Sequence, residues 1–301
     1  MSAYELIFDY RDNKHHNNDF LNLIKKSGKS CLEDWMTKGH WDENYVPFAL
    51  INNKGEIVAN IGAIKFSLFI EGVRYNAVQL GQVIIKDSHK DQNLEEELIA
   101  LIVSKYENIV DVIFSYDPEI SPYLIKNHGF MDAHEYKYFK DWDPNLEPSG
   151  NIIKKIDTDG SKELAYIQTE IKHSTRMSKK IATSGDSQIK LFNILKYFRK
   201  NVYYIPSFEA IAVFSFTDGL FQLAGVYSKN NIEIDELLRV IVPLGINKIE
   251  FGFIPYVSDL QKQPLKYNTG HMPKIHRLAI NAISAPIDFE SVLFPMLSRI
   301  K

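Results

Sequence analysis

The stretch from residue 83 to residue 98 constrains this chain most, because it combines a strand, a turn and a helix start. Residues 83–85 are β-branched, and a short run of that kind before a polar turn indicates a buried strand. Asn93, with Glu96 three residues later, resembles a capping box and predicts a helix start. Free N–H groups of a first helical turn attract anions. The stretch therefore predicts an α/β unit with an anion site after a strand.

Further patterns in the first half of the chain predict a sheet with flanking helices. Apolar runs predict strands at residues 4–9, 46–51, 57–70, 74–85 and 110–116. Helical periodicity predicts helices at residues 17–26, 31–38 and 121–127, besides the one that starts at Asn93, and Gly28 is expected to end the first of them. The Asn52–Gly55 segment predicts a hairpin turn. Residues 130–139 alternate in polarity and predict one closing strand, on which Asp132 and His134 share a face.

The second half of the chain repeats this order in outline. We expect strands at residues 152–156, 202–205, 210–216, 220–227 and 248–254, and helices from residue 161 and at 188–199 and 234–240. Residues 141–150 contain two prolines and a glycine among polar residues, which predicts a linker. The apolar segment 289–300 is expected to dock on a core. We interpret His271, His276 and Arg277 as surface charge.

Composition narrows the class of protein. A length of 301 residues suggests about two domains of roughly 150 residues each. The net charge of −3 argues against a nucleic-acid binder. Cys31 is the one cysteine, so a disulfide within the chain is excluded, and Asp132 with His134 lacks a third ligand, so we expect no metal. No signal peptide or membrane span is visible, which predicts a cytoplasmic protein.

Residues 83–98 resemble motif A of the GNAT (Gcn5-related) N-acetyltransferases, written roughly V-x-V-x-P-x-x-R-G-x-G-x-G-x-x-L. The positions that match are Val83, Ile85, Lys90, Gln92, Leu94 and Leu98. The three glycine positions carry Asp91, Asn93 and Glu95, and the proline position carries Asp87. Asn tolerates the left-handed conformation that glycine adopts. The two acids instead bring negative charge to a site that would hold a pyrophosphate.

The resemblance implies a fold and an activity. It implies a GNAT-like mixed central sheet flanked by helices (α/β, or more finely α+β) as an acyl-CoA binding domain over residues 1–140. A second, degenerate GNAT-like domain follows over residues 151–301, after the linker at 141–150. The implied activity is transfer of an acetyl group from acetyl-CoA to a primary amine, of a small molecule or a peptide, by direct attack on the thioester. In tandem members the second unit shapes the acceptor cleft or makes a dimer contact, so a homodimer is one implied arrangement.

The same resemblance implies which residues contact the cofactor. Strand and turn backbone would hold acetyl-CoA at Val83, Ile84, Ile85, Lys90, Asp91, Gln92, Asn93, Leu94 and Glu95. Residues 124–130 resemble the later motif F-Y-x-x-x-G-F, but the position of the proton-donating tyrosine carries Ile125. Tyr123 is the candidate catalytic residue, although two residues on a helix correspond to about 200° of rotation. The alternative is a catalytically inactive GNAT-fold binding or interaction module, in which Asp91, Glu95 and Ile125 mark lost chemistry.

Overall fold

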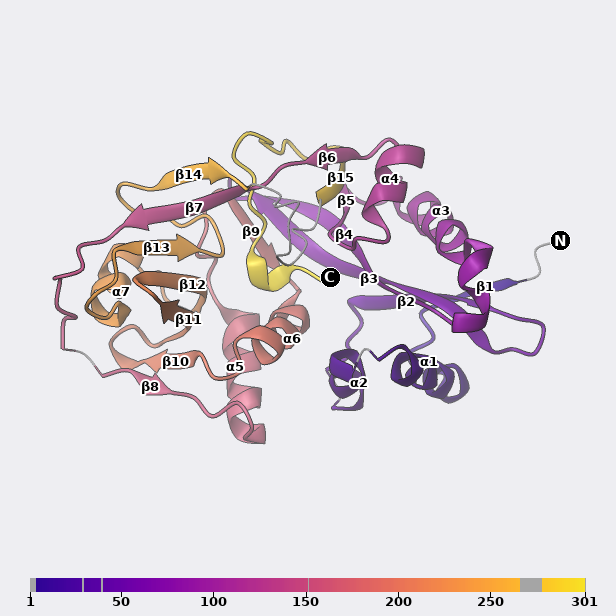
Figure 1. Cartoon of the computed structure of the whole chain (residues 1–301), viewed down its shortest axis with the longest axis horizontal. Coiled ribbons are helices and arrows are strands. Elements are labelled where there is room, and N and C mark those ends of the chain that lie inside the picture. Colours follow the sequence, from indigo (N-terminus) through magenta and orange to yellow (C-terminus); the bar gives the residue numbers. More distant parts are fainter. Residues whose placement is uncertain (1–3, 29, 39, 151, 266–277, 301) are drawn as a thin grey trace.

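The computed structural model describes residues 4–28, 30–38, 40–150, 152–265 and 278–300. The strands of these residues form two mixed sheets with helices on their faces (Figure 1). His271, His276 and Arg277 lie outside the described residues, so their interpretation stays a prediction. Within the described residues, none of the helices is both long and apolar enough to pass through a membrane.

The first sheet has eight strands in the order β1-β2-β3-β4-β5-β15-β6, with β9 paired to β3. Their bounds are β1 Glu5–Phe8, β2 Tyr45–Ile51, β3 Ile57–Ile70, β4 Val73–Ile85, β5 Val112–Ser115, β6 Met131–Ala133, β9 Ile181–Ser184 and β15 Leu278–Ala282. Only the β4–β5 pair among these described strands is parallel. Helices α1 (Lys14–Ser27) and α2 (Ser30–Thr37) cover one face, and α3 (Leu94–Tyr106) and α4 (Ser121–Asn127) cover the other.

The second sheet has seven strands in the order β14-β7-β13-β12-β11-β10-β8. Their bounds are β7 Tyr136–Asp141, β8 Lys154–Lys155, β10 Val202–Ile205, β11 Ala210–Thr217, β12 Leu220–Tyr227, β13 Lys248–Phe251 and β14 Gln261–Pro264. Helices α5 (Ser161–His173) and α6 (Ser187–Tyr197) pack on one face through a cluster that includes Ile167, Leu191 and Ile194. Helix α7 (Ile234–Ile241) connects β12 to β13, which are parallel.

The two sheets have the same connection order, and each sheet includes at least one strand from the other half of the chain. In each, three antiparallel strands lead through a helix to a parallel fourth strand: β2-β3-β4, α3 and β5 in the first, and β10-β11-β12, α7 and β13 in the second. The next strand in the first sheet is β15, from the second half of the chain. The next strand in the second sheet is β7, from the first half. The predicted division at residues 141–150 stays a prediction about domains, and these two strands link the halves across it.

This exchange corrects one prediction. The single closing strand predicted at residues 130–139 is wrong, because β6 lies in the first sheet and β7 in the second. The chain leaves the strand conformation at His134 and Glu135, and the Glu135 side chain is buried among polar partners. Asp132 and His134 therefore do not share one continuous strand.

Other expected elements are confirmed. The strands, helices and hairpin predicted before residue 130 occur within a few residues of their predicted bounds. Gly28 ends α1 in the left-handed conformation, with φ 72°. The segment 289–300 docks on the core as predicted, and its buried apolar side chains are Val292, Leu293, Phe294, Leu297 and Ile300.

Candidate functional site

Strands β4 and β5 part at the centre of the first sheet. Their parallel pairing runs from Ala77 opposite Val112 to Leu80 opposite Ser115, and then stops. The β3–β4 register shifts at the same level, and Gln82 adopts a positive φ of 64°. An extra residue of this kind bends a strand and breaks the ladder locally. We call the region beyond Leu80 and Ser115, where the two strands no longer pair, the β4–β5 gap.

The protein's own groups lie beside this gap. The Gln82 amide donates to Oδ2 of the buried Asp117, at 3.1 Å. On the face covered by α1 and α2, Gly81 lies against Ile300, since a Cβ added at Gly81 would be 2.6 Å from Ile300 Cγ2. The Gln79 side chain donates to the Ile300 carbonyl oxygen at 2.9 Å. Asp117 and Ile300 therefore occupy the immediate surroundings of the bulge.

A buried ion pair fixes the segment that carries Ile300. Arg299 contacts Glu135 through two N···O distances, Nη1–Oε2 at 2.9 Å and Nη2–Oε1 at 3.0 Å. Glu135 Oε1 also accepts from the Tyr116 hydroxyl at 2.8 Å and from the Phe294 amide at 2.9 Å. The Phe294 ring stacks on a β5 ring, that of Phe114. Segment 293–300 is thus held by charge, hydrogen bonds and packing together.

The predicted strand, turn and helix at residues 83–98 are confirmed as elements. Val83 and Ile84 are buried in β4, and Ile85 is half-buried. The Lys86 amide donates to the Val58 carbonyl, and strand pairs use every second residue, so the Ile85 amide faces away from β3. This amide is a main-chain donor directed to the side of the gap.

The turn itself is a 3₁₀ helix, η1 (Asp87–Gln92), which the sequence did not predict. Its i→i+3 bonding uses amides of the turn, so these amides are less available to a ligand than in an open loop. The Lys90 ammonium contacts Asp87 at 2.7 Å, and this contact raises the pKa of Lys90. Gln92 accepts a hydrogen bond from the Tyr4 hydroxyl. Asp91 is exposed.

Asn93 occupies the glycine-like conformation between η1 and α3, with φ 53°. The predicted helix start is correct, but the capping box is wrong, because the Asn93 side chain makes no cap hydrogen bond in this left-handed conformation. Leu94 is buried in the core under α3. In the part of the chain that the structure describes, Oε2 of Glu95 is buried without a hydrogen-bond partner. A carboxylate in that position disfavours a nearby anion.

Tyr123 lies in the first turn of α4, partly buried, with its ring 5.3 Å from that of His128. Partial burial and the nearby Glu96 raise the pKa of Tyr123, so the phenol stays protonated at neutral pH. Ile125, at the family's tyrosine position, packs against the core of the α3 face. The structure leaves the role of Tyr123 as a prediction.

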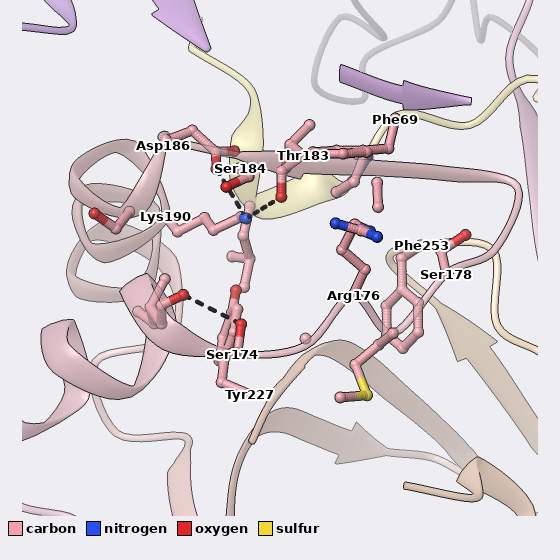
Figure 2. Close-up of a pocket in the computed structure, with 18 of the residues that line it drawn as sticks. Phe69, Ser174, Arg176, Ser178, Thr183, Ser184, Asp186, Lys190, Tyr227 and Phe253 are labelled. Carbon is pink, nitrogen blue, oxygen red and sulfur yellow. Dashed lines mark hydrogen bonds and ion pairs between the residues drawn. The ribbon is translucent and has the colours of Figure 1, made fainter. Parts of the chain in front are cut away.

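A cavity of about 730 Å³ lies beside the second sheet, where β12 extends beyond its pairing with β13 (Figure 2). Its walls come from the end of α5, the connection to β9, the start of α6 and the end of β12. It also contacts residues 42–44 and the β3–β4 turn of the first half. The sequence reasoning did not identify this site.

One wall of the cavity contains a buried ion pair. Lys190 Nζ lies 2.9 Å from Asp186 Oδ1 and 3.4 Å from the Thr183 carbonyl oxygen (Figure 2). Burial alone raises the pKa of Asp186, but Lys190, Ser298 and Thr183 together lower that pKa below its usual value. Burial and the Asp186 charge raise the pKa of the neighbouring Tyr227. The spacing of Asp186 and Lys190 by four residues on a helix was the sequence signal for this pair.

Comparison with solved structures defines the fold. The chain resembles a probable N-acyltransferase from Enterococcus faecalis, with 11% identity and a TM-score of 0.52 over 94% of this chain and 73% of that one. It resembles Eis1 from Mycobacterium abscessus, with 11% identity and a TM-score of 0.53 over 93% and 74% of the two chains. A GCN5-related N-acetyltransferase from Kribbella flavida matches with 12% identity and a TM-score of 0.52 over 94% and 72%.

The chain therefore has the fold of GNAT-related acetyltransferases, and the predicted fold class is confirmed. No family model and no curated protein matches the sequence. At identities this low, the likeness establishes the fold, and the chemistry has to be argued from the site.

Proposed function

We propose that the chain is an acyl-CoA-dependent N-acyltransferase that transfers an acetyl group from acetyl-CoA to a primary amine of a small molecule or peptide. The observation that supports this most is the parting of β4 and β5 beside the bulge at Gln82. Parting a parallel pair leaves main-chain donors and acceptors that a strand-like ligand can use. The pantetheine arm of CoA carries amides that suit such a gap.

In this proposal, main-chain groups rather than side chains make most of the contacts that accelerate the reaction. The neutral amine nitrogen attacks the thioester carbon and forms the C–N bond, the C–S bond breaks, the thiolate leaves, and the excess proton on the nitrogen passes to solvent water. Main-chain donors of this strand, such as the Ile85 amide that faces away from β3, stabilise the developing oxyanion, and this positioning requires no titrating side chain. Lys90 and amides of residues 90–94 hold the pyrophosphate. A protonated Tyr123 would supply the proton that the thiolate accepts.

The alternative, a non-catalytic GNAT-fold module, also has a specific observation in its favour. The Asp117 carboxylate accepts a hydrogen bond from the main-chain amide of the bulge residue Gln82, and Ile300 lies against Gly81. Acetyl-CoA bound in this gap has to use the amides beyond the bulge or displace Asp117. If neither occurs, the fold persists without the transfer reaction.

A titration with acetyl-CoA distinguishes the two. The transferase proposal expects saturable binding with a Kd in the micromolar range, about −8 kcal/mol. Lys90→Gln should weaken that binding several-fold, because a contact to phosphate is lost. Lys54→Gln, which alters an exposed lysine in the β2–β3 hairpin, is the matched control and should bind as the parent does. Absence of heat and of thermal stabilisation at millimolar acetyl-CoA would support the module instead.

A further inference from the structure

The cavity beside β12 has the size and lining of a small-molecule site. Its volume of about 730 Å³ lies within the range of roughly 300–1,000 Å³ typical of ligand pockets. The buried side chains of Ile171, Phe253 and Leu297 line it and provide an apolar surface. The rest of the lining is largely polar, so these three side chains form a patch that suits the apolar part of an otherwise polar ligand.

The positively charged side chain of Arg176 lies on the side of the cavity away from the Asp186–Lys190 pair. The Arg176 guanidinium lies over the Phe69 ring, 4.1 Å from its centroid (Figure 2). Among the described residues, no carboxylate forms an ion pair with Arg176. Stacking on a ring leaves the in-plane N–H groups free to bind a carboxylate in bidentate fashion. Lys172, in the last turn of α5, and Lys179, on the connection from α5 to β9, also line the cavity and add positive charge.

Hydrogen-bond acceptors also line the cavity. Glu43 and Glu71 are exposed side chains of the first half that line it. Gln188, at the start of α6, also lines it, and within the described residues its buried Oε1 has no hydrogen-bond partner. An unpaired buried acceptor is costly, and a ligand N–H group would satisfy it. Among the described residues that line the cavity, four acids balance four basic side chains, so the lining favours a ligand with both charges over a polyanion such as a nucleotide phosphate.

We propose that this cavity binds a small zwitterion with an apolar body, of the class of amino acids with aromatic or long aliphatic side chains. The ligand carboxylate pairs with Arg176, its side chain lies on the apolar patch, and its ammonium donates to Gln188. This binding goes beyond the proposed acyl transfer and does not require it, since no contact involves the β4–β5 gap.

Calorimetric titration without any CoA tests the proposal. The probes are phenylalanine, phenethylamine, which lacks the carboxylate, and 3-phenylpropionate, which lacks the ammonium. We expect saturable binding of phenylalanine and at least about tenfold weaker binding of both analogues, because each loses charge-assisted hydrogen bonds. Arg176→Met should weaken phenylalanine binding by about ten- to a hundredfold. Arg239→Met, which alters an exposed arginine on α7 outside the cavity, is the control and should leave binding unchanged.

Each other result overturns the proposal. If 3-phenylpropionate binds as tightly as phenylalanine, the cavity does not recognise the ammonium group of the ligand. If Arg176→Met and Arg239→Met weaken binding equally, Arg176 does not pair with the carboxylate. If phenylalanine and leucine both give no heat and no thermal shift at millimolar concentration, the ligand class is wrong. A protein that binds phenylalanine but not acetyl-CoA supports this inference while contradicting the proposed transfer, so the two failures are distinguishable.

Discussion

Replacing Arg299 with methionine removes one half of the buried ion pair that holds segment 293–300. The side chains of Arg299 and Glu135 are 10% and 6% exposed, so water cannot replace the lost guanidinium easily. Among the described residues, the Glu135 carboxylate would then keep the neutral donors of Tyr116 and Phe294. Leaving a buried charge without its partner costs about 3–5 kcal/mol of unfolding free energy. We expect Arg299→Met to lower the free energy of unfolding by an amount in this range.

Urea unfolding of a double-mutant set measures this effect. The set is Arg299→Met, Glu135→Leu and the double variant, which buries no charge at this position. We expect the double variant to be more stable than the sum of the single losses predicts, by about 1–3 kcal/mol. Arg199→Met is the control, because its ion pair with Asp159 has side chains that are 50% and 71% exposed. Exposed pairs of this kind contribute about 0–1 kcal/mol.

Two results would refute the reasoning. The first is a loss for Arg299→Met that is no larger than the loss for Arg199→Met. The second is strict additivity of the Arg299 and Glu135 substitutions, which would show that the two charges do not stabilise each other. Either result would mean that packing, such as that of Phe294 on Phe114, holds the segment without the ion pair.

Three further predictions follow from the same contacts. The pKa of Asp186 is lower in the folded state than in the unfolded state, so the ionised carboxylate stabilises the protein at pH values above the unfolded pKa, and this contribution disappears as pH falls through the folded pKa. Asp186→Asn should therefore flatten the fall in melting temperature between about pH 5 and pH 2. An unchanged slope would contradict this. Gly81→Ala should lower the free energy of unfolding by about 1–3 kcal/mol, because the new methyl group overlaps with Ile300. Adding Ile300→Ala should relieve much of that cost in the double variant. Full additivity of the two substitutions in urea unfolding would argue against the contact. Asp91→Gly combined with Glu95→Gly should tighten acetyl-CoA binding by roughly two- to tenfold by removing negative charge near the pyrophosphate; unchanged or weaker affinity would mean that the cofactor lies elsewhere.

Local pattern was sufficient for most elements of the first half. The β-branched run at residues 83–85, the hairpin at residues 52–55 and the helical glycine stop at Gly28 each depend on neighbours within a few residues. Such patterns predict elements without knowledge of the partner strand. The strands β9, β14 and β15 were missed, because they are short and are stabilised by pairing with residues far away in the chain.

The candidate sites show the same limit. The sequence placed the glycine-like conformation at Asn93 and located the stretch on which the cofactor proposal rests. It could not show that Asp117 would hold the Gln82 amide, since these residues lie 35 positions apart. It also could not show that Arg176 and Phe69 would meet in a cavity.

By itself, the sequence determined the alternation of strands and helices and the resemblance of residues 83–98 to a nucleotide-binding turn. The tertiary structure decided that β7 and β15 change sheets, and that segment 293–300 lies across the core. The physical reason is that periodicity records which side of an element is buried, whereas a strand's partner depends on contacts with residues distant in the chain. The cavity with Arg176 and Phe69 is made of such contacts, so only the folded chain could reveal it.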